Sequence, residues 1–480
     1  MESLKEKTAR GIFWGGMNNG VQQVIGLAFG IILGRLLSPS DYGMMAMISI
    51  FSLIATTLQN SGFTVALTNL KEPTHRDYNS VFWFNIIVGV SMYLILFFCA
   101  PLIADYYHTE SITPLCRYAF LSIVIASFGT AQSARLFKNL MVKQQAMAGM
   151  TAVICSSAVG AAMAWSGWAY WSLATQGLVF VGINTVMVWY FSHWRPTFDI
   201  DFGPVCKMFR FSCKVLATAI TTNINNNVLN ILLGHYFTAH ETGNYNQAYQ
   251  WNSKCFNLVQ GMVNQVAQPV LVDLREDKGR QLNAFRKMVR FTAFISFPLM
   301  LGLGLISREF IIIAITKKWL ASALLLQILC VSGAVMPLCS LMSNMIISKG
   351  RSGIYFWCTF SLGLSQIVLM ILIWHFGMRF MVIAYTVINV LWLFVWHYFT
   401  YKLTNYSIAM LLRDILPLAF SALGVMVITY YATLQITNLY ILLLLRMIIA
   451  ATLYYVIMRL AHVKILDECQ TYIISKIKKP

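Results

Sequence analysis

Amide side chains recur at helical spacing within one long apolar part of the chain, residues 244–270. The polar positions are Asn246, Gln250, Lys254, Asn257, Gly261, Asn264 and Gln268. Steps of three or four residues put all of them on one side of an α-helix. An amide without a hydrogen-bond partner in hydrocarbon costs roughly 2–7 kcal/mol, so this side must contact water or other helices. Its length favours a water-filled cavity over a helix–helix interface.

Lys254 carries the charge on this polar face. A charge so deep in an apolar segment is a functional-site hypothesis, and the alternative is that its long stem reaches an interface. An ammonium group among amide donors suits an anion such as a phosphate or diphosphate, and amides also suit sugar hydroxyls. The seventeen carboxylates fall in predicted tails, loops or span ends. That placement disfavours a carrier of organic cations and a carboxylate proton relay.

A second polar cluster, TTNINNNVLN, covers residues 221–230. Hydrogen bonds between helices are the alternative to a cavity lining, and the density of asparagine favours the cavity. Lys214 and Arg117 have ordinary alternatives as anchors near the membrane interface. The predicted substrate-binding residues outside the polar face of 244–270 are Asn223, Asn226, Asn230, Lys214, Asn19, Gln22, Asn60 and Arg117.

The elements that position these residues are predicted membrane helices. The 480 residues are 58% hydrophobic and only 11% charged, with a mean hydropathy of +0.66, whereas a soluble domain is about a quarter charged. This predicts an all-α polytopic membrane protein with about fourteen spans. The expected spans are 11–34, 42–66, 79–104, 114–134, 146–166, 168–192, 211–234, 244–270, 289–314, 319–346, 353–375, 380–400, 414–433 and 439–460.

Lysine and arginine concentrate in alternate loops when the N-terminus is placed in the cytoplasm. The positive-inside rule therefore predicts that both termini are cytoplasmic. The basic C-terminal segment, VKILDECQTYIISKIKKP, is predicted to lie as an amphipathic tail on the inner leaflet. The net charge of +18 follows mostly from this topology and gives no reason to expect nucleic acid.

A faint internal repeat divides the chain into lobes. IILGRLLSPSDYG at 31–43 and ILLGHYFTAHETG at 231–243 share two glycines at an offset of 200 residues, and each joins the first two helices of a lobe. Repeats of this kind are common in transporters, with the substrate site between them. We predict an N-lobe over 1–200, a C-lobe over 201–402, and two further helices with the tail over 403–480. The two lobes would be six-helix bundles around a central cavity.

Signatures of enzymes, metals and cofactors are not found in the sequence. It contains no P-loop, GxSxG or HExxH motif. The ten cysteines have no metal-ligand spacing and are expected to be apolar filler. We therefore expect a non-enzymatic protein without a metal or cofactor.

The stretch GRLLSPSDYG after an amide-rich first helix, with its counterpart GHYFTAHETGNYNQAYQ, resembles the polysaccharide transporter family of oligosaccharide flippases. That family belongs to a superfamily that also holds MATE drug exporters and lipid II flippases. The resemblance implies alternating-access movement of undecaprenyl-diphosphate-linked oligosaccharides to the outer leaflet of a bacterial inner membrane, for capsule, O-antigen or exopolysaccharide. It also implies coupling to an ion gradient, H⁺ or Na⁺, and work beside the polysaccharide polymerase machinery.

Two alternatives remain open at this stage. One is a multidrug or small-molecule exporter of the same fold, which the missing deep carboxylate disfavours. The other is a membrane polysaccharide polymerase or ligase, which would be expected to carry a large outside loop. The predicted outside loops are short.

Overall fold

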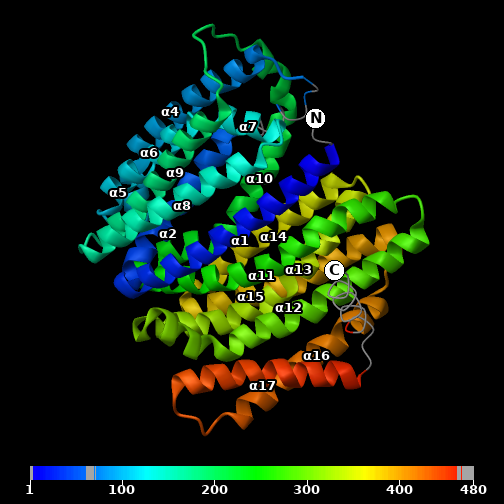
Figure 1. Cartoon of the computed structure of the whole chain (residues 1–480). Helices are drawn as coiled ribbons and strands as arrows, with labels where there is room; N and C mark the ends of the chain where they lie inside the picture. The colour runs from blue at the N-terminus through cyan, green and yellow to red at the C-terminus, as the bar shows by residue number, and fades with distance from the viewer. Residues whose placement is uncertain (1–3, 61–66, 68–69, 71, 462–465, 467–480) are drawn as a thin grey trace. The chain divides into compact units, whose positions relative to one another are not determined.

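The computed structural model describes an almost entirely helical chain (Figure 1). It describes the backbone of residues 4–60, 67, 70, 72–461 and 466, and the side chains of the same residues apart from 4–19, 58–60, 206–215 and 217–218. Within these residues there is no β-strand. This confirms the predicted all-α class. The predicted C-terminal tail after Ala461 lies outside the described residues, Leu466 excepted.

By internal contacts the chain divides into two compact units, Met1–Gly243 and Asn244–Pro480. The first unit contains α1 (Leu4–Leu36), α2 (Pro39–Asn60), α4 (His75–Tyr106), α5 (Ile112–Ala119), α6 (Leu121–Ser127), α7 (Thr130–Lys138), α8 (Val142–Trp165), α9 (Tyr170–Ser192), α10 (Gly203–Tyr236) and the first turn of α11 (Ala239–Asp273). The predicted lobes divide the chain by repeat rather than by contact, and their boundaries stay a prediction.

The second unit continues along α11. Its other elements are α12 (Lys278–Ile315), η1 (Lys317–Trp319), α13 (Leu320–Ser348), α14 (Ser352–Ile373), η2 (Trp374–Phe376), α15 (Met378–Thr404), α16 (Ile408–Ala432) and α17 (Leu439–Leu460). Helix α12 packs against α13, α16 and α17, and α13 packs against α14 and α15. The longest of these helices, α12, is therefore the element around which the second unit is built.

A helix or a broken helix lies at every predicted span. Among the described residues, nine helices are long and apolar enough to cross a membrane, or ten if a bent pair counts as one. Helix α11 is not among them, because its amides and Lys254 lower its hydropathy. The transmembrane character is thus supported, and the number fourteen stays a prediction.

The predicted span 114–134 is divided into α5, α6 and α7. The segment Ile112–Ser127 is bent by 45° relative to Thr130–Lys138, and Gly129 stands directly before the second part. Glycine lacks a side chain and is less stable than alanine inside a helix, so a helix often breaks at glycine.

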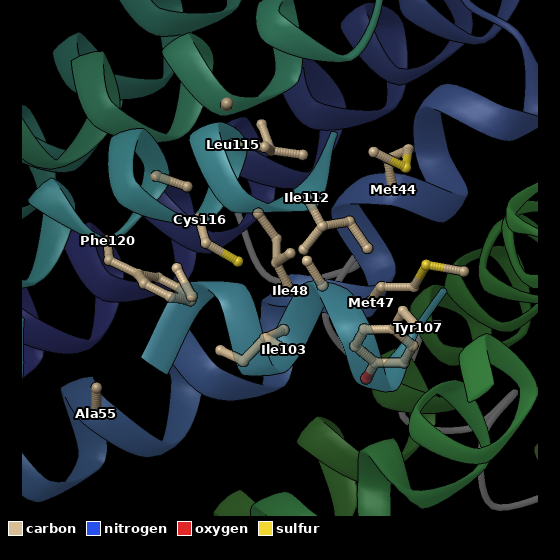
Figure 2. Close-up of a cluster of buried hydrophobic side chains, with 14 of the residues drawn as sticks. Met44, Met47, Ile48, Ala55, Ile103, Tyr107, Ile112, Leu115, Cys116 and Phe120 are labelled. Carbon is tan, nitrogen blue, oxygen red and sulfur yellow. The ribbon is translucent and has the colours of Figure 1, made fainter. Parts of the chain in front are cut away.

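The core of the first unit lies where α2, α4 and α5 meet (Figure 2). Its fully buried members include Ile48, Ile112, Leu115 and Phe120. Lipid tails are as apolar as these side chains, so close packing rather than transfer out of water holds membrane helices together. This cluster fixes α2, which also packs against α10.

The segment between α9 and α10 is fastened to the start of α4. The side chain of Asn79 donates to the carbonyl oxygen of Asp199 at 2.6 Å and accepts from the amide of Thr197 at 2.9 Å. The indole of Trp83 donates to the carbonyl of Thr197 at 2.7 Å. The hydropathy break predicted after the sixth span is therefore a loop whose backbone polar groups are held by side chains.

The two repeated motifs share one local structure. In the first, Ser38 donates from its amide and hydroxyl to the Asp41 carboxylate at 2.8 and 2.7 Å. In the second, Thr238 does the same to Glu241 at 3.2 and 3.0 Å. Each motif is a capping box that starts a helix, α2 or α11, by satisfying amide groups locally.

Candidate functional site

The predicted polar face of α11 lies apart from its buried side. Asn246, Gln250 and Lys254 are half-buried, and Asn257 and Asn264 are exposed. The buried side of the same helix carries Trp251, Asn252, Phe256, Val259 and Val263. The helical spacing therefore separates these polar residues from the buried side of α11. Leu258, Met262 and Val266 are exposed as well, and the binding role of the polar residues stays a prediction.

Lys254 lies against an aromatic ring. Its ammonium nitrogen is 4.7 Å from the centroid of the Trp251 ring. A cation over a ring face gains about 0.5–2 kcal/mol, which falls short of an ion pair as compensation for a buried charge. The Trp251 indole nitrogen is itself buried and has no hydrogen-bond partner within the described part of the chain. The indole nitrogen faces the protein interior, so the group on this part of α11 that a ligand could reach is the half-buried Lys254 ammonium.

Asn264 contributes to helix packing as well as to the polar face. Its side-chain oxygen accepts from the Ser340 hydroxyl at 2.9 Å and from the Asn344 amide at 2.7 Å. A third bond between α11 and α13 joins the Ser322 hydroxyl to Asn244 at 2.8 Å. Some of the amides on α11 therefore hold α13, which is the alternative that the sequence left open.

The asparagine cluster of α10 is also divided between two roles. Asn223 donates to the hydroxyl of Thr57 on α2 at 2.8 Å, and Asn227 donates to the Asn223 carbonyl one turn earlier at 3.0 Å. Asn226 is exposed, whereas Asn230 is buried, with a side-chain oxygen that lacks a partner among the described residues. Asn223 thus fastens α10 to α2, while Asn226 and Asn230 retain free polar capacity.

Arg117 ties α5 to α4. Its guanidinium carbon lies 4.3 Å from the centroid of the Phe97 ring, and its Nε donates to the Phe97 carbonyl at 3.4 Å. These contacts fit the anchoring alternative. Gln22 is half-buried on α1, which packs against α8. The side chains of Asn19, Asn60 and Lys214 lie outside the described residues.

The structure contains two buried carboxylates that the sequence analysis placed at span ends. Glu309 on α12 and Arg446 on α17 form an ion pair at 3.0 Å with 5% and 8% of their side chains exposed. Asp414 on α16 accepts from Arg286 on α12 at 2.9 and 3.0 Å. Both acids lie near the ends of their helices, as expected, and the structure adds that both are buried between helices. The isolated Arg446 in an apolar span was the available signal, since a buried cation demands a counter-charge.

Tyr406 completes the Asp414 cluster from the short connection between α15 and α16. Its hydroxyl donates to Asp414 at 3.1 Å. Burial, and next the Asp414 carboxylate, raise the pKa of Tyr406 above its ordinary value. The phenol therefore stays protonated and remains a donor to the carboxylate. Both buried acids have cationic partners, which makes them structural groups. Within the described residues no cluster of three or more histidine, cysteine or acidic side chains is arranged to hold a metal ion.

The fold is similar to that of a solved lipid II flippase. The structure superposes on that of the lipid II flippase MurJ, in an inward closed conformation, with a TM-score of 0.75. The superposition covers 94% of this chain and 99% of that chain, at 14% sequence identity. At that identity the likeness defines the fold alone.

The chain belongs to the polysaccharide biosynthesis protein family, whose model matches residues 32–324. It is 24% identical over 360 residues to the lipopolysaccharide biosynthesis protein WzxC of Escherichia coli strain K12, covering 74% of this chain and 72% of that protein. It is 23% identical over 359 residues to the teichuronic acid biosynthesis protein TuaB of Bacillus subtilis strain 168, covering 74% of each. The family resemblance seen in the sequence is confirmed.

Proposed function

We propose that this protein is a flippase that moves an undecaprenyl-diphosphate-linked oligosaccharide from the inner to the outer leaflet. The repeat unit would serve capsule, O-antigen or exopolysaccharide assembly. Membership of the polysaccharide biosynthesis protein family supports the substrate class. The observation that carries the proposal is the polar face of α11, where Lys254 is half-buried against a tryptophan ring.

The chemistry of this face fits a substrate with an anionic head and many hydroxyls. The Lys254 ammonium donates to a diphosphate oxygen, and an ionised acceptor makes such a hydrogen bond about twice as strong as a neutral one. Gln250 and Asn257 lie one turn to either side and offer amide donors and acceptors for sugar hydroxyls. The asparagines of α10, in the same lobe as α11, and the amides of α1, in the other lobe, are proposed to line the same cavity. A substrate so held transfers its polar head past the apolar core of the membrane.

The proposed setting is a bacterial inner membrane with both termini in the cytoplasm. Transport proceeds by alternating access between the lobes 1–200 and 201–402 and draws on an H⁺ or Na⁺ gradient. The polymerase machinery takes up the product at the outer leaflet. Collapse of each gradient in turn, with flipping followed in proteoliposomes, identifies the coupling ion.

Deletion of the gene tests the function directly. We expect surface polysaccharide to disappear and a diphosphate-linked repeat unit to accumulate on the inner leaflet. Complementation with the wild-type gene restores the polymer, whereas Lys254→Ala, expressed at the same level, does not. Unchanged polymer together with increased drug sensitivity would support a small-molecule exporter of the same fold instead.

A further inference from the structure

The helices α2 and α11 cross at two glycines, where their backbones touch. A methyl group at Gly43 would overlap the carbonyl oxygen of Ala239, and a methyl group at Gly243 would overlap the carbonyl oxygen of Pro39. The added group at Gly243 would also stand 2.9 Å from the Gly43 nitrogen. Only glycine permits this approach at either position, because any side chain would push the two helices apart.

The C-terminal end of α10 packs beside this crossing. A methyl group at Gly234 would lie 2.7 Å from the Tyr107 ring and 2.9 Å from the Met47 side chain. The next residue, His235, stacks on Tyr106 with ring centroids 4.2 Å apart and shares a 2.7 Å hydrogen bond with its carbonyl oxygen. The glycine crossing, the close approach at Gly234 and the stacking of His235 therefore bring α2, α4, α10 and the first turn of α11 together.

The crossing is built so that it can separate at little cost. The amide groups at the starts of α2 and α11 are satisfied by their own capping boxes, Ser38 with Asp41 and Thr238 with Glu241. Separation of the helices therefore leaves these caps intact and exposes no new unpaired donor there. Glycine also contributes no interlocked side chain that would have to change rotamer.

We propose that this crossing is the outer closure of the transport path, and that Gly43 and Gly243 part and meet again in each cycle. The inference rests on the proposed function and on the topology with a cytoplasmic N-terminus, which puts both repeated turns on the outer side. It assigns the repeated glycines a role in gating that is separate from the substrate-binding face of α11.

The first test is Gly43→Ala, with Gly182→Ala as the matched control, because a methyl group at Gly182 in α9 meets no atom within 4 Å. Labelling is measured in a chain whose ten native cysteines are replaced and that carries Asn226→Cys, which a membrane-impermeant thiol reagent reaches from outside. Export is measured separately, in chains that keep Asn226. We expect Gly43→Ala to raise labelling and to lower export by about tenfold or more, a backbone overlap being a severe overpacking. Labelling and export like those of Gly182→Ala would overturn the proposal.

The second test keeps both glycines and so does not depend on the folding of a glycine variant. Ser40→Cys and His240→Cys, each one residue beyond a contacting carbonyl, are joined by a cleavable bifunctional thiol reagent. We expect the linked protein to lose export and to regain it after cleavage, with neither single variant affected. Full export by the linked protein would overturn the closure. The two proposals can fail separately. If Gly43→Ala increases labelling but deletion of the gene leaves the surface polymer unchanged, the closure is supported and the flippase function is rejected.

Discussion

Two sets of polar groups within the second unit differ in how their polarity is satisfied. On α12, α16 and α17, each buried acid meets an arginine, as in Glu309 with Arg446 and Asp414 with Arg286. On α11, Lys254 meets an aromatic ring and Asn257 is exposed. A paired group serves the fold because its partner is already present. A group without a full partner is available for a ligand, so this difference separates stability from function.

Loss of the Glu309 carboxylate should have the largest effect on stability. Glu309→Ala leaves the guanidinium of Arg446 buried without its counter-charge, and breaking a buried pair in this way costs about 3–5 kcal/mol. The measurement is the free energy of unfolding in detergent micelles. The double variant Glu309→Leu/Arg446→Leu should recover much of the loss, because it removes both charges. If Glu309→Ala has the same free energy of unfolding as the wild type, the pair has no structural role.

Removal of the Lys254 charge should instead affect transport alone. A hydrogen bond to a charged group contributes about 1.5–3 kcal/mol, so Lys254→Ala should lower flipping roughly 10- to 100-fold. Unfolding should be unchanged, since no ion pair is broken. Lys254→Arg keeps the charge and should retain part of the activity. A loss of stability as large as that of Glu309→Ala would move Lys254 into the structural set.

Asn264 belongs to both sets and should show an intermediate effect. Asn264→Ala leaves Ser340 and Asn344 without their acceptor. Two such bonds between membrane helices contribute roughly 1 kcal/mol to the unfolding free energy. Asn257→Ala, on the same face and exposed, is the matched control and should leave stability unaltered. Equal stabilities of the two variants would show that the bonds to α13 contribute little.

The smallest expected difference lies within the asparagine cluster of α10. Asn223→Ala removes the bond to Thr57, and such bonds between membrane helices contribute about 0.6 kcal/mol on average. Asn226→Ala removes an exposed amide and should not change unfolding. In flipping assays we expect the opposite order of effects, with Asn226→Ala lowering the flipping rate more than Asn223→Ala. If the same variant has the larger effect in both assays, the distinction between Asn223, which holds α10 to α2, and Asn226, which is proposed to line the cavity, is wrong.

Much of the fold could be predicted, because hydropathy and helical spacing are local properties. They located a helix at each expected span and separated the polar side of α11 from the side that carries Trp251 and Val263. Helix α12 extends beyond the predicted span 289–314, back to Lys278, because its first turns are polar and hydropathy does not detect them. The division of the span 114–134 also depends on packing that hydropathy does not describe.

Partners far apart in the sequence could not be predicted. The pairing of Glu309 with Arg446 and the bonds of Asn264 to α13 depend on which helices become neighbours. Likewise, only the fold shows that the guanidinium of Arg117, a predicted binding residue, contacts Phe97. A residue type shows that a partner is needed, but only the fold shows which partner it has.

The glycine crossing is isologous, in the sense used for symmetric dimers. Residue 43 meets residue 239, and residue 243 meets residue 39. The offset of 200 residues makes these the same contact seen from its two sides. Surfaces of this kind are self-complementary and allow identical chains to associate around a two-fold axis. A half-length chain with one copy of the motif would therefore already possess both halves of the contact, so the crossing requires no feature that arose after the two copies were joined.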